Sequence, residues 1–69
     1  MKKNNEKIIT DLSKNISIIE NVYDTLHHGA MGKALIRRKR EHQVATIVHN
    51  LGAAIDNLRD LMLDIEDEN

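Results

Sequence analysis

The 69-residue sequence contains no cysteine, no proline, no tryptophan and no phenylalanine, and it has a single tyrosine. Without cysteine the chain can form neither a disulfide framework nor a thiolate zinc site, and it has no cysteine nucleophile. The lack of proline and the presence of only three glycines leave little to punctuate a series of short strands. The length allows one domain, which we assign to residues 1–69. These absences favour a single helical domain.

Long apolar runs are also missing. No run of apolar residues exceeds three, whereas a membrane-spanning helix needs about 20. The lysines that follow the first methionine are not backed by the apolar stretch of a secretory signal. We therefore expect a cytoplasmic protein with no membrane-spanning segment.

Charge is nearly balanced over the whole chain and unevenly distributed along it. Ten basic residues stand against eleven acidic residues, for a formal net charge of −1. Residues 33–42 hold five basic residues and one acidic residue, whereas residues 56–69 hold six acidic residues and one basic residue. The charge blocks therefore indicate more about partners than the overall charge does.

Apolar residues recur at helical spacing in two segments. In the first segment they occupy the a and d positions of a heptad, namely Ile9, Leu12, Ile16, Ile19, Tyr23 and Leu26. The same lettering places at a and d in the second segment Val44, Ile47, Leu51, Ala54, Leu58, Leu61 and Ile65. Val48, Ile55 and Met62 fill the neighbouring e positions. Three apolar residues per heptad are typical of a helix in a bundle.

Glycines and histidines separate the two segments. A glycine after two histidines, Gly29, is a favourable helix stop because glycine adopts the left-handed cap conformation at low cost. Gly32 can then serve as the N-cap of a second helix. We therefore predict an all-α antiparallel two-helix hairpin, with a helix over residues 4–28, a turn at 29–31 and a helix over residues 32–66.

Two alternatives to this hairpin remain open. Three helices would result if the second helix broke near Asn50–Gly52, since a glycine weakens a helix interior. One uninterrupted helix would also fit, because the heptad lettering runs through the turn without a shift.

The charge blocks favour the antiparallel arrangement. Each predicted helix has basic residues near its N-terminus and acidic residues near its C-terminus, which is unfavourable for its own macrodipole. Antiparallel packing brings Glu20 and Asp24 beside the basic residues of 33–40. It also brings Lys2, Lys3 and Lys7 nearer the acidic C-terminal segment.

A single hairpin of this length covers only part of each apolar stripe, and chains below about 70–80 residues rarely bury enough apolar surface alone. Because disulfides are absent, self-association is the remaining source of a larger core. The turn end is positive and the open end is negative, so two hairpins attract each other head to tail. We predict an antiparallel homodimer that forms a four-helix bundle. Its predicted core comprises Val44, Ile47, Val48, Leu51, Ile55, Leu58, Leu61, Met62 and Ile65.

Motifs for catalysis or metal binding are weak. Asp24 and His27 have the carboxylate–histidine spacing of di-iron bundles, with Glu20 one turn earlier, but they fall off the seam where bundles hold metals. The segment 29–33 lacks the spacer and the Ser/Thr of a phosphate-binding loop. We therefore expect no catalytic residue, no metal, no cofactor and no enzymatic activity.

The basic segment over residues 33–40 is the most informative feature. Lys33, Arg37 and Arg40 occupy a and d positions, where a core stripe should lie. Either their stems cover apolar residues while their heads reach acidic groups, or this end is an exposed surface that binds a ligand. The candidate partner-binding patch comprises Lys33, Leu35, Ile36, Arg37, Arg38, Lys39 and Arg40.

Two kinds of ligand suit this patch. A basic helix can contact phosphates or enter a major groove, but the near-neutral charge and the single tyrosine count against nucleic acid. A mixed basic and apolar surface fits a partner protein better. We therefore predict a small non-enzymatic regulatory or adaptor protein that binds a partner protein as a homodimer. The alternative is a nucleic-acid-binding regulator that uses residues 33–40; mimicry of DNA by residues 56–68 is a third interpretation, based on charge alone.

Overall fold

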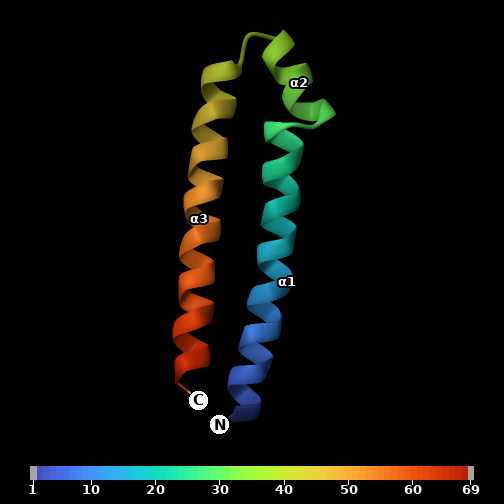
Figure 1. Cartoon of the computed structure of the whole chain (residues 1–69). Helices are drawn as coiled ribbons and strands as arrows, with labels where there is room; N and C mark the ends of the chain where they lie inside the picture. Colours follow the sequence, from blue (N-terminus) through green and yellow to red (C-terminus); the bar gives the residue numbers. More distant parts are fainter. Residues whose placement is uncertain (1, 69) are drawn as a thin grey trace.

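The computed structural model describes the backbone of residues 2–68 and the side chains of residues 5–68. These residues form three α-helices and no strand: α1 over Lys2–His27, α2 over Ala30–Arg37 and α3 over Glu41–Asp67 (Figure 1). The prediction of an all-α chain is confirmed. In this part of the chain, no helix combines the length and the apolar character needed to cross a membrane.

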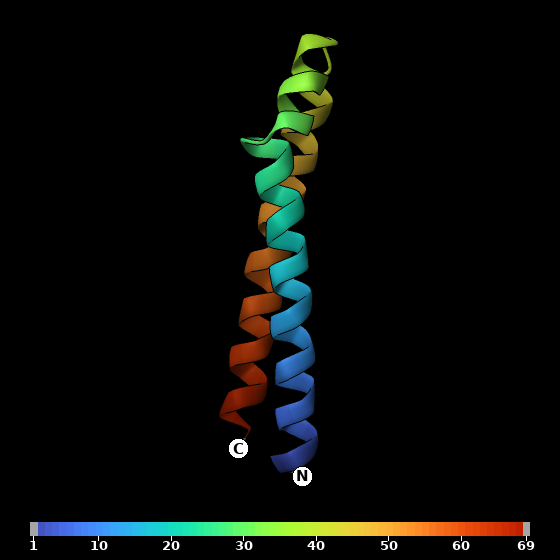
Figure 2. The ribbon, with the colours of Figure 1, turned by 90° about the vertical axis from the view of Figure 1, so that its right-hand side faces the viewer.

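The helices build a thin rod whose Cα atoms extend over 50 × 16 × 12 Å. α1 and α3 lie side by side and run in opposite directions, so that both ends of the chain lie at the same end of the rod (Figures 1 and 2). α2 lies at the other end, beyond the last turn of α1, and contacts both long helices. The rod therefore has an open end with the termini and a turn end with α2.

The face that α1 turns towards α3 follows the predicted heptad. Ile16 and Leu26 are buried. The other predicted a and d residues are half-buried, namely Ile9, Leu12, Ile19 and Tyr23. Regular spacing of aliphatic residues thus specified the contact face of α1 correctly.

On α3, the predicted apolar positions divide into covered and uncovered ones. Val44 and Ile55 are buried, whereas the d residues Ile47 and Leu61 keep 44% and 46% of their surface exposed. The large apolar residues of α3 that are buried or half-buried alternate in steps of four and three, namely Val44, Val48, Leu51, Ile55, Leu58, Met62 and Ile65; the small Ala54, at position d, is half-buried as well. Positions a and e therefore form the contact with α1, and position d lies beside it.

The predicted continuous helix over residues 32–66 is wrong, because α2 ends in a turn at residues 38–40. The backbone N–H of Lys39 donates to the carbonyl of Ile36 at 2.8 Å, and that of Arg40 donates to the carbonyl of Leu35 at 3.0 Å. This pair of bonds is a Schellman motif, in which the residue after the C-cap adopts a left-handed backbone conformation. Lys39 supplies it with a φ of 64°.

Electrostatics gives a reason for a helix end at this point. In a continuous helix, Arg37 and Arg40 would stack as like charges three residues apart. Ending α2 instead places Arg37 in its last turn, and α3 starts with Glu41 in its first turn. Both placements suit the helix macrodipole, so the mismatch expected for the basic segment is not found.

The other two alternatives are not observed either. α3 continues through Gly52 without interruption, so the break near Asn50–Gly52 is absent. The turns at residues 28–29 and 38–40 exclude a single helix.

The glycines at the first turn differ from their predicted roles. Gly29 has an extended backbone, with φ −83° and ψ 179°, and it is the N-cap of α2. Gly32 is a buried residue inside α2. A Cβ atom at Gly32 would lie 2.0 Å from the carbonyl oxygen of Leu26. Gly32 is therefore needed because α2 packs directly on the backbone at the end of α1.

Candidate partner-binding site

The predicted patch gathers at the turn end of the rod, where α2 ends and the chain turns into α3 (Figure 1). Residues 33–37 lie on α2, and residues 38–40 form the turn. We call this segment, residues 33–40, the basic tip. The patch is therefore one continuous surface feature, although its residues belong to a short helix and a turn instead of one long helix.

The bases of the basic tip are free of ion pairs. All five are exposed, and none lies within 4.0 Å of a described carboxylate. Their one side-chain hydrogen bond within the described residues runs from Arg40 to Gln43, at 3.1 Å. Leu35 is half-buried, and Ile36 keeps 47% of its surface exposed. The expected pairing of these bases with Glu20 or Asp24 is absent.

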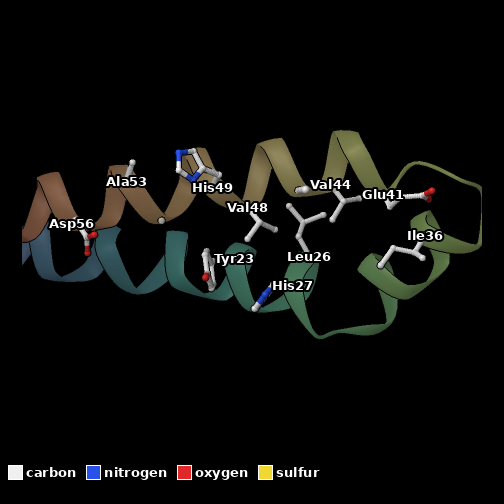
Figure 3. A pocket seen from close by; sticks show the side chains of 12 residues that line it. Tyr23, Leu26, His27, Ile36, Glu41, Val44, Val48, His49, Ala53 and Asp56 are labelled. Atoms are coloured by element: carbon white, nitrogen blue, oxygen red, sulfur yellow. The ribbon is translucent and has the colours of Figure 1, made fainter.

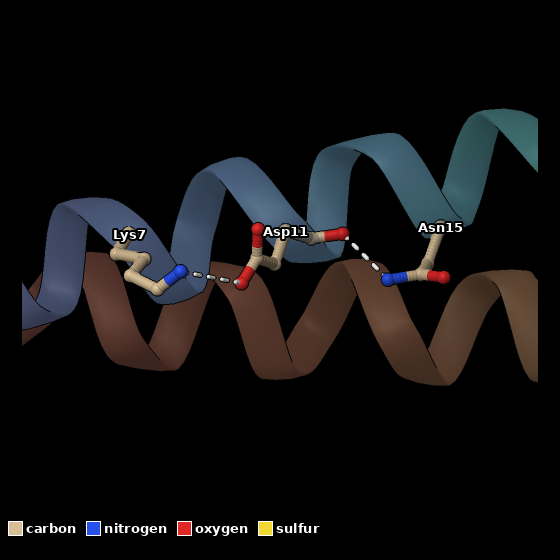
Figure 4. A network of polar contacts seen from close by, with 3 residues as sticks. All are labelled: Lys7, Asp11 and Asn15. Carbon is tan, nitrogen blue, oxygen red and sulfur yellow. Dashed lines mark hydrogen bonds and ion pairs between the residues drawn. The ribbon is translucent and has the colours of Figure 1, made fainter.

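Two bases elsewhere in the chain do have carboxylate partners. Arg59 of α3 pairs with Glu20 across the contact between α1 and α3. Lys7 lies 3.9 Å from a carboxylate oxygen of Asp11, whose carbonyl also accepts a hydrogen bond from Asn15 at 2.8 Å (Figure 4). The expected approach of Lys2 and Lys3 to the acidic end of α3 concerns side chains outside the described residues.

A groove of about 630 Å³ adjoins the basic tip on one side of the rod. Ile36 borders it, and Glu41 and Asp56 lie at its two ends (Figure 3). Its apolar lining comes from Tyr23, Leu26, Val44, Ala45, Val48 and Ala53. The sequence analysis did not find this groove.

The groove owes part of its shape to Gly52. A Cβ atom at Gly52 would lie 3.4 Å from a ring carbon of Tyr23, so the glycine leaves a gap beside the ring. The ring of Tyr23 also lies 5.3 Å from that of His27, between centroids. A glycine directly after the a position Leu51, inside a predicted helix, was the available sequence signal for such a gap.

A second, more polar groove of about 590 Å³ continues along the same side. It is lined by the Glu20–Arg59 pair together with Ser17, Asn21, Asp24 and Asp56. Four charged residues, Glu20, Asp24, Asp56 and Arg59, thus lie on this side of the rod, which we call the groove side.

The residues considered for a metal do not form a site. Glu20 is engaged by Arg59, and His27 bonds to His28, with 2.8 Å between their ring nitrogens. Among the described residues, no group of three or more histidine, aspartate or glutamate side chains could hold a metal ion. Asp24 and His27 are accordingly surface residues here.

The residues predicted for a dimer core lie along α3. Seven of the nine are buried or half-buried in the single chain, whereas Ile47 and Leu61 are exposed. Comparisons with models of protein families, with curated proteins and with solved structures found no match for the chain.

Proposed function

We propose that the chain is a small non-enzymatic regulatory or adaptor protein that binds a partner protein through its basic tip and acts as a homodimer. One observation carries the partner site: five exposed bases and the exposed Ile36 gather at one end without carboxylate partners. Like charges crowded in this way repel one another, and only Arg37 offsets this through its place at the C-terminus of α2, so a function in binding is the simplest reason for the cluster.

The chemistry of the tip specifies the kind of partner. Arginine guanidinium groups bind carboxylates in a bidentate geometry, and they carry this charge at every physiological pH. Ile36, which is exposed on the same segment, adds an apolar contact. The matching surface is therefore acidic with an apolar depression, as found at many protein interfaces.

Nucleic acid is the alternative ligand for the same residues. The short α2 and the turn at 38–40 count against a long basic helix that lies in a major groove. The chain also has only one aromatic side chain other than histidine on which a base could stack. We therefore favour the protein partner, and we make duplex binding an outcome of the test.

Two double variants that remove the same charge test this proposal. R37Q/R38Q removes two bases from the tip, and K7Q/K14Q removes two exposed bases from α1. Each tagged protein is used to capture partners from the native cell, with quantification by mass spectrometry. We expect at least one partner to fall about tenfold with R37Q/R38Q and to stay unchanged with K7Q/K14Q, since a lost interfacial charge pair costs about 1.4 kcal/mol or more.

One control checks that the variants fold, and two outcomes would contradict the proposal. Circular dichroism and sedimentation of each variant must match those of the native chain, so that a lost partner reflects the tip. Equal capture by the two double variants would contradict a partner site at the tip. Tight binding of a generic 20-base-pair duplex that collapses between about 50 and 200 mM salt would favour the nucleic-acid function instead.

A further inference from the structure

The single chain leaves more surface exposed than a folded monomer of its size. Its accessible surface is 5388 Å², whereas the scaling of surface with mass gives about 4,400 Å² for 7.9 kDa. The excess of about 1,000 Å² is close to the roughly 800 Å² that each partner buries in a standard interface. Among the described side chains, only four apolar ones are buried, namely Ile16, Leu26, Val44 and Ile55. The area matches one missing partner of similar size.

Helix geometry identifies the uncovered side. Successive residues of an α-helix are about 100° apart, so a residue two positions further points to the opposite flank. Glu20 and Arg59 meet on the groove side. Val22 and Leu61, each two residues further, therefore lie on the other side of the α1–α3 pair. Both are exposed large apolar residues.

Other apolar residues extend this side along the rod. Ile47 and Ala54 precede Leu61 by fourteen and seven residues, so the three form one row on α3. Ile8 shares the row of Val22, and Ile18 lies one turn away on α1. We call these residues the apolar face: Ile8, Ile18, Val22, Ile47, Ala54 and Leu61.

The apolar face carries no charge along its α3 row, in contrast to the groove side. The neighbouring row of α3 holds the uncharged Gln43, Asn50 and Asn57, and its last member is the charged Asp64. An apolar centre with a polar rim is the usual composition of a protein interface. The charged residues beside the face, Asp11 and Asp64, are exposed, and a second copy of the chain supplies the same mixed composition.

Resting on the homodimer of the proposed function, we propose that the second copy docks on the apolar face, with α3 of one copy antiparallel to α3 of the other. When two such faces pack on each other about a two-fold axis perpendicular to the rods, the rods run in opposite directions. Each helix then packs on the same helix of the other copy. The axis then passes near Ala54, which is the middle of the row and small enough for close approach of the helices. Ile47 of each copy meets Leu61 of the other.

The charges along α3 favour this antiparallel order over the parallel one. Arg40 and Glu68 each lie 14 residues from Ala54, so the basic turn of one copy comes level with the acidic end of the other. Parallel rods would instead place the two basic tips together and the two acidic ends together. Arg37 and Arg38 lie further from Ala54 than Arg40 does, beyond the level of Glu68 in the other copy. Their replacement therefore tests the partner site and not the dimer.

Cysteine cross-linking tests the face, because the native chain has no thiol that could interfere. A54C and A53C make the same substitution at adjacent positions, about 100° apart on α3. Ala53 points away from both α1 and the apolar face. With a short bismaleimide at equal protein concentration, we expect A54C to form a covalent dimer at least tenfold faster than A53C.

The orientation has its own test with I47C and L61C. Antiparallel docking predicts that an equimolar mixture of the two variants cross-links into a mixed dimer, while each alone cross-links slowly. Efficient cross-linking of I47C alone and of L61C alone would overturn the antiparallel order. Equal rates for A54C and A53C in a chain that sediments as a dimer would overturn the face but not the homodimer. A native chain that sediments as a monomer would overturn both.

Discussion

Replacing Gly32 by alanine is the sharpest test of how the turn end is built. A Cβ atom there would lie 2.0 Å from the carbonyl oxygen of Leu26 and 2.7 Å from its carbonyl carbon. Both atoms belong to the backbone, so no side-chain rotation can relieve the clash, and α2 must move away from α1. Overpacking of this kind costs up to about 3 kcal/mol, of which the better helix propensity of alanine recovers about 1.

The expected result for G32A is thus a loss of about 2 kcal/mol in the free energy of unfolding. In a chain of this length, that lowers the melting temperature by about 8–16 °C. Thermal unfolding followed by circular dichroism at 222 nm measures it. Protein concentration must be the same for every variant, because a dimer melts at a concentration-dependent temperature.

G52A provides the matched control. It is the same substitution within a helix, but its Cβ atom would lie 3.4 Å from a ring carbon of Tyr23, which is ordinary contact. We expect G52A to stabilise the fold by about 0.5–1 kcal/mol through helix propensity. If G32A melted at or above the temperature of G52A, the close packing of α2 on the end of α1 would be refuted.

Four further substitutions, K39G, I55A, L63A and L61E, test other parts of the structure. K39G should stabilise the chain by about 1 kcal/mol in urea unfolding, because glycine adopts the left-handed conformation of the turn without strain; a destabilised K39G would contradict the turn. I55A should lose about 2–5 kcal/mol in the same assay, whereas L63A, at an exposed site, should stay within about 0.5 kcal/mol. Similar losses for the two would mean that Ile55 is not in the core. L61E should keep its helical content and halve the sedimenting mass, since it places a charge in the apolar face; a dimeric L61E would exclude Leu61 from the interface.

The sequence predicted best what depends on regular spacing. Aliphatic residues at a and d specified the face of α1, because the burial of one helix stripe requires only that its residues recur on one side. On α3 the stripe is three positions wide, and the sequence alone could not tell which two positions face α1. The choice depends on how the helices rotate about their axes when they pack, as Ile47 and Leu61 illustrate.

The sequence failed where one backbone meets another or adopts a rare conformation. Lys39 in a left-handed conformation has no compositional signal, since that conformation is usually taken by glycine or asparagine. Gly32 resembled a cap because its close approach to Leu26 exists only once α2 is folded against α1. Both features move residues 38–40 out of a helix and into a turn.

The candidate site was predicted as a set of residues but not as a shape. Consecutive bases necessarily stay together, so residues 33–40 were certain to form one patch. Their lack of carboxylate partners among the described residues was not predictable. Glu20 was expected beside residues 33–40, and its actual pairing with Arg59 depends on the α1–α3 register. The groove beside the tip depends on the same register, through Tyr23 and Gly52.

Sedimentation equilibrium of the native chain at about 10 μM and moderate salt tests the central claim most directly. We propose that a second copy of the chain covers the apolar face of the first. The basic tips of both copies then remain available to a partner protein. This proposal predicts a single species of twice the 7.9 kDa chain mass, because burial of the apolar face does not depend on the end charges. A species of 7.9 kDa with full helical content would contradict it.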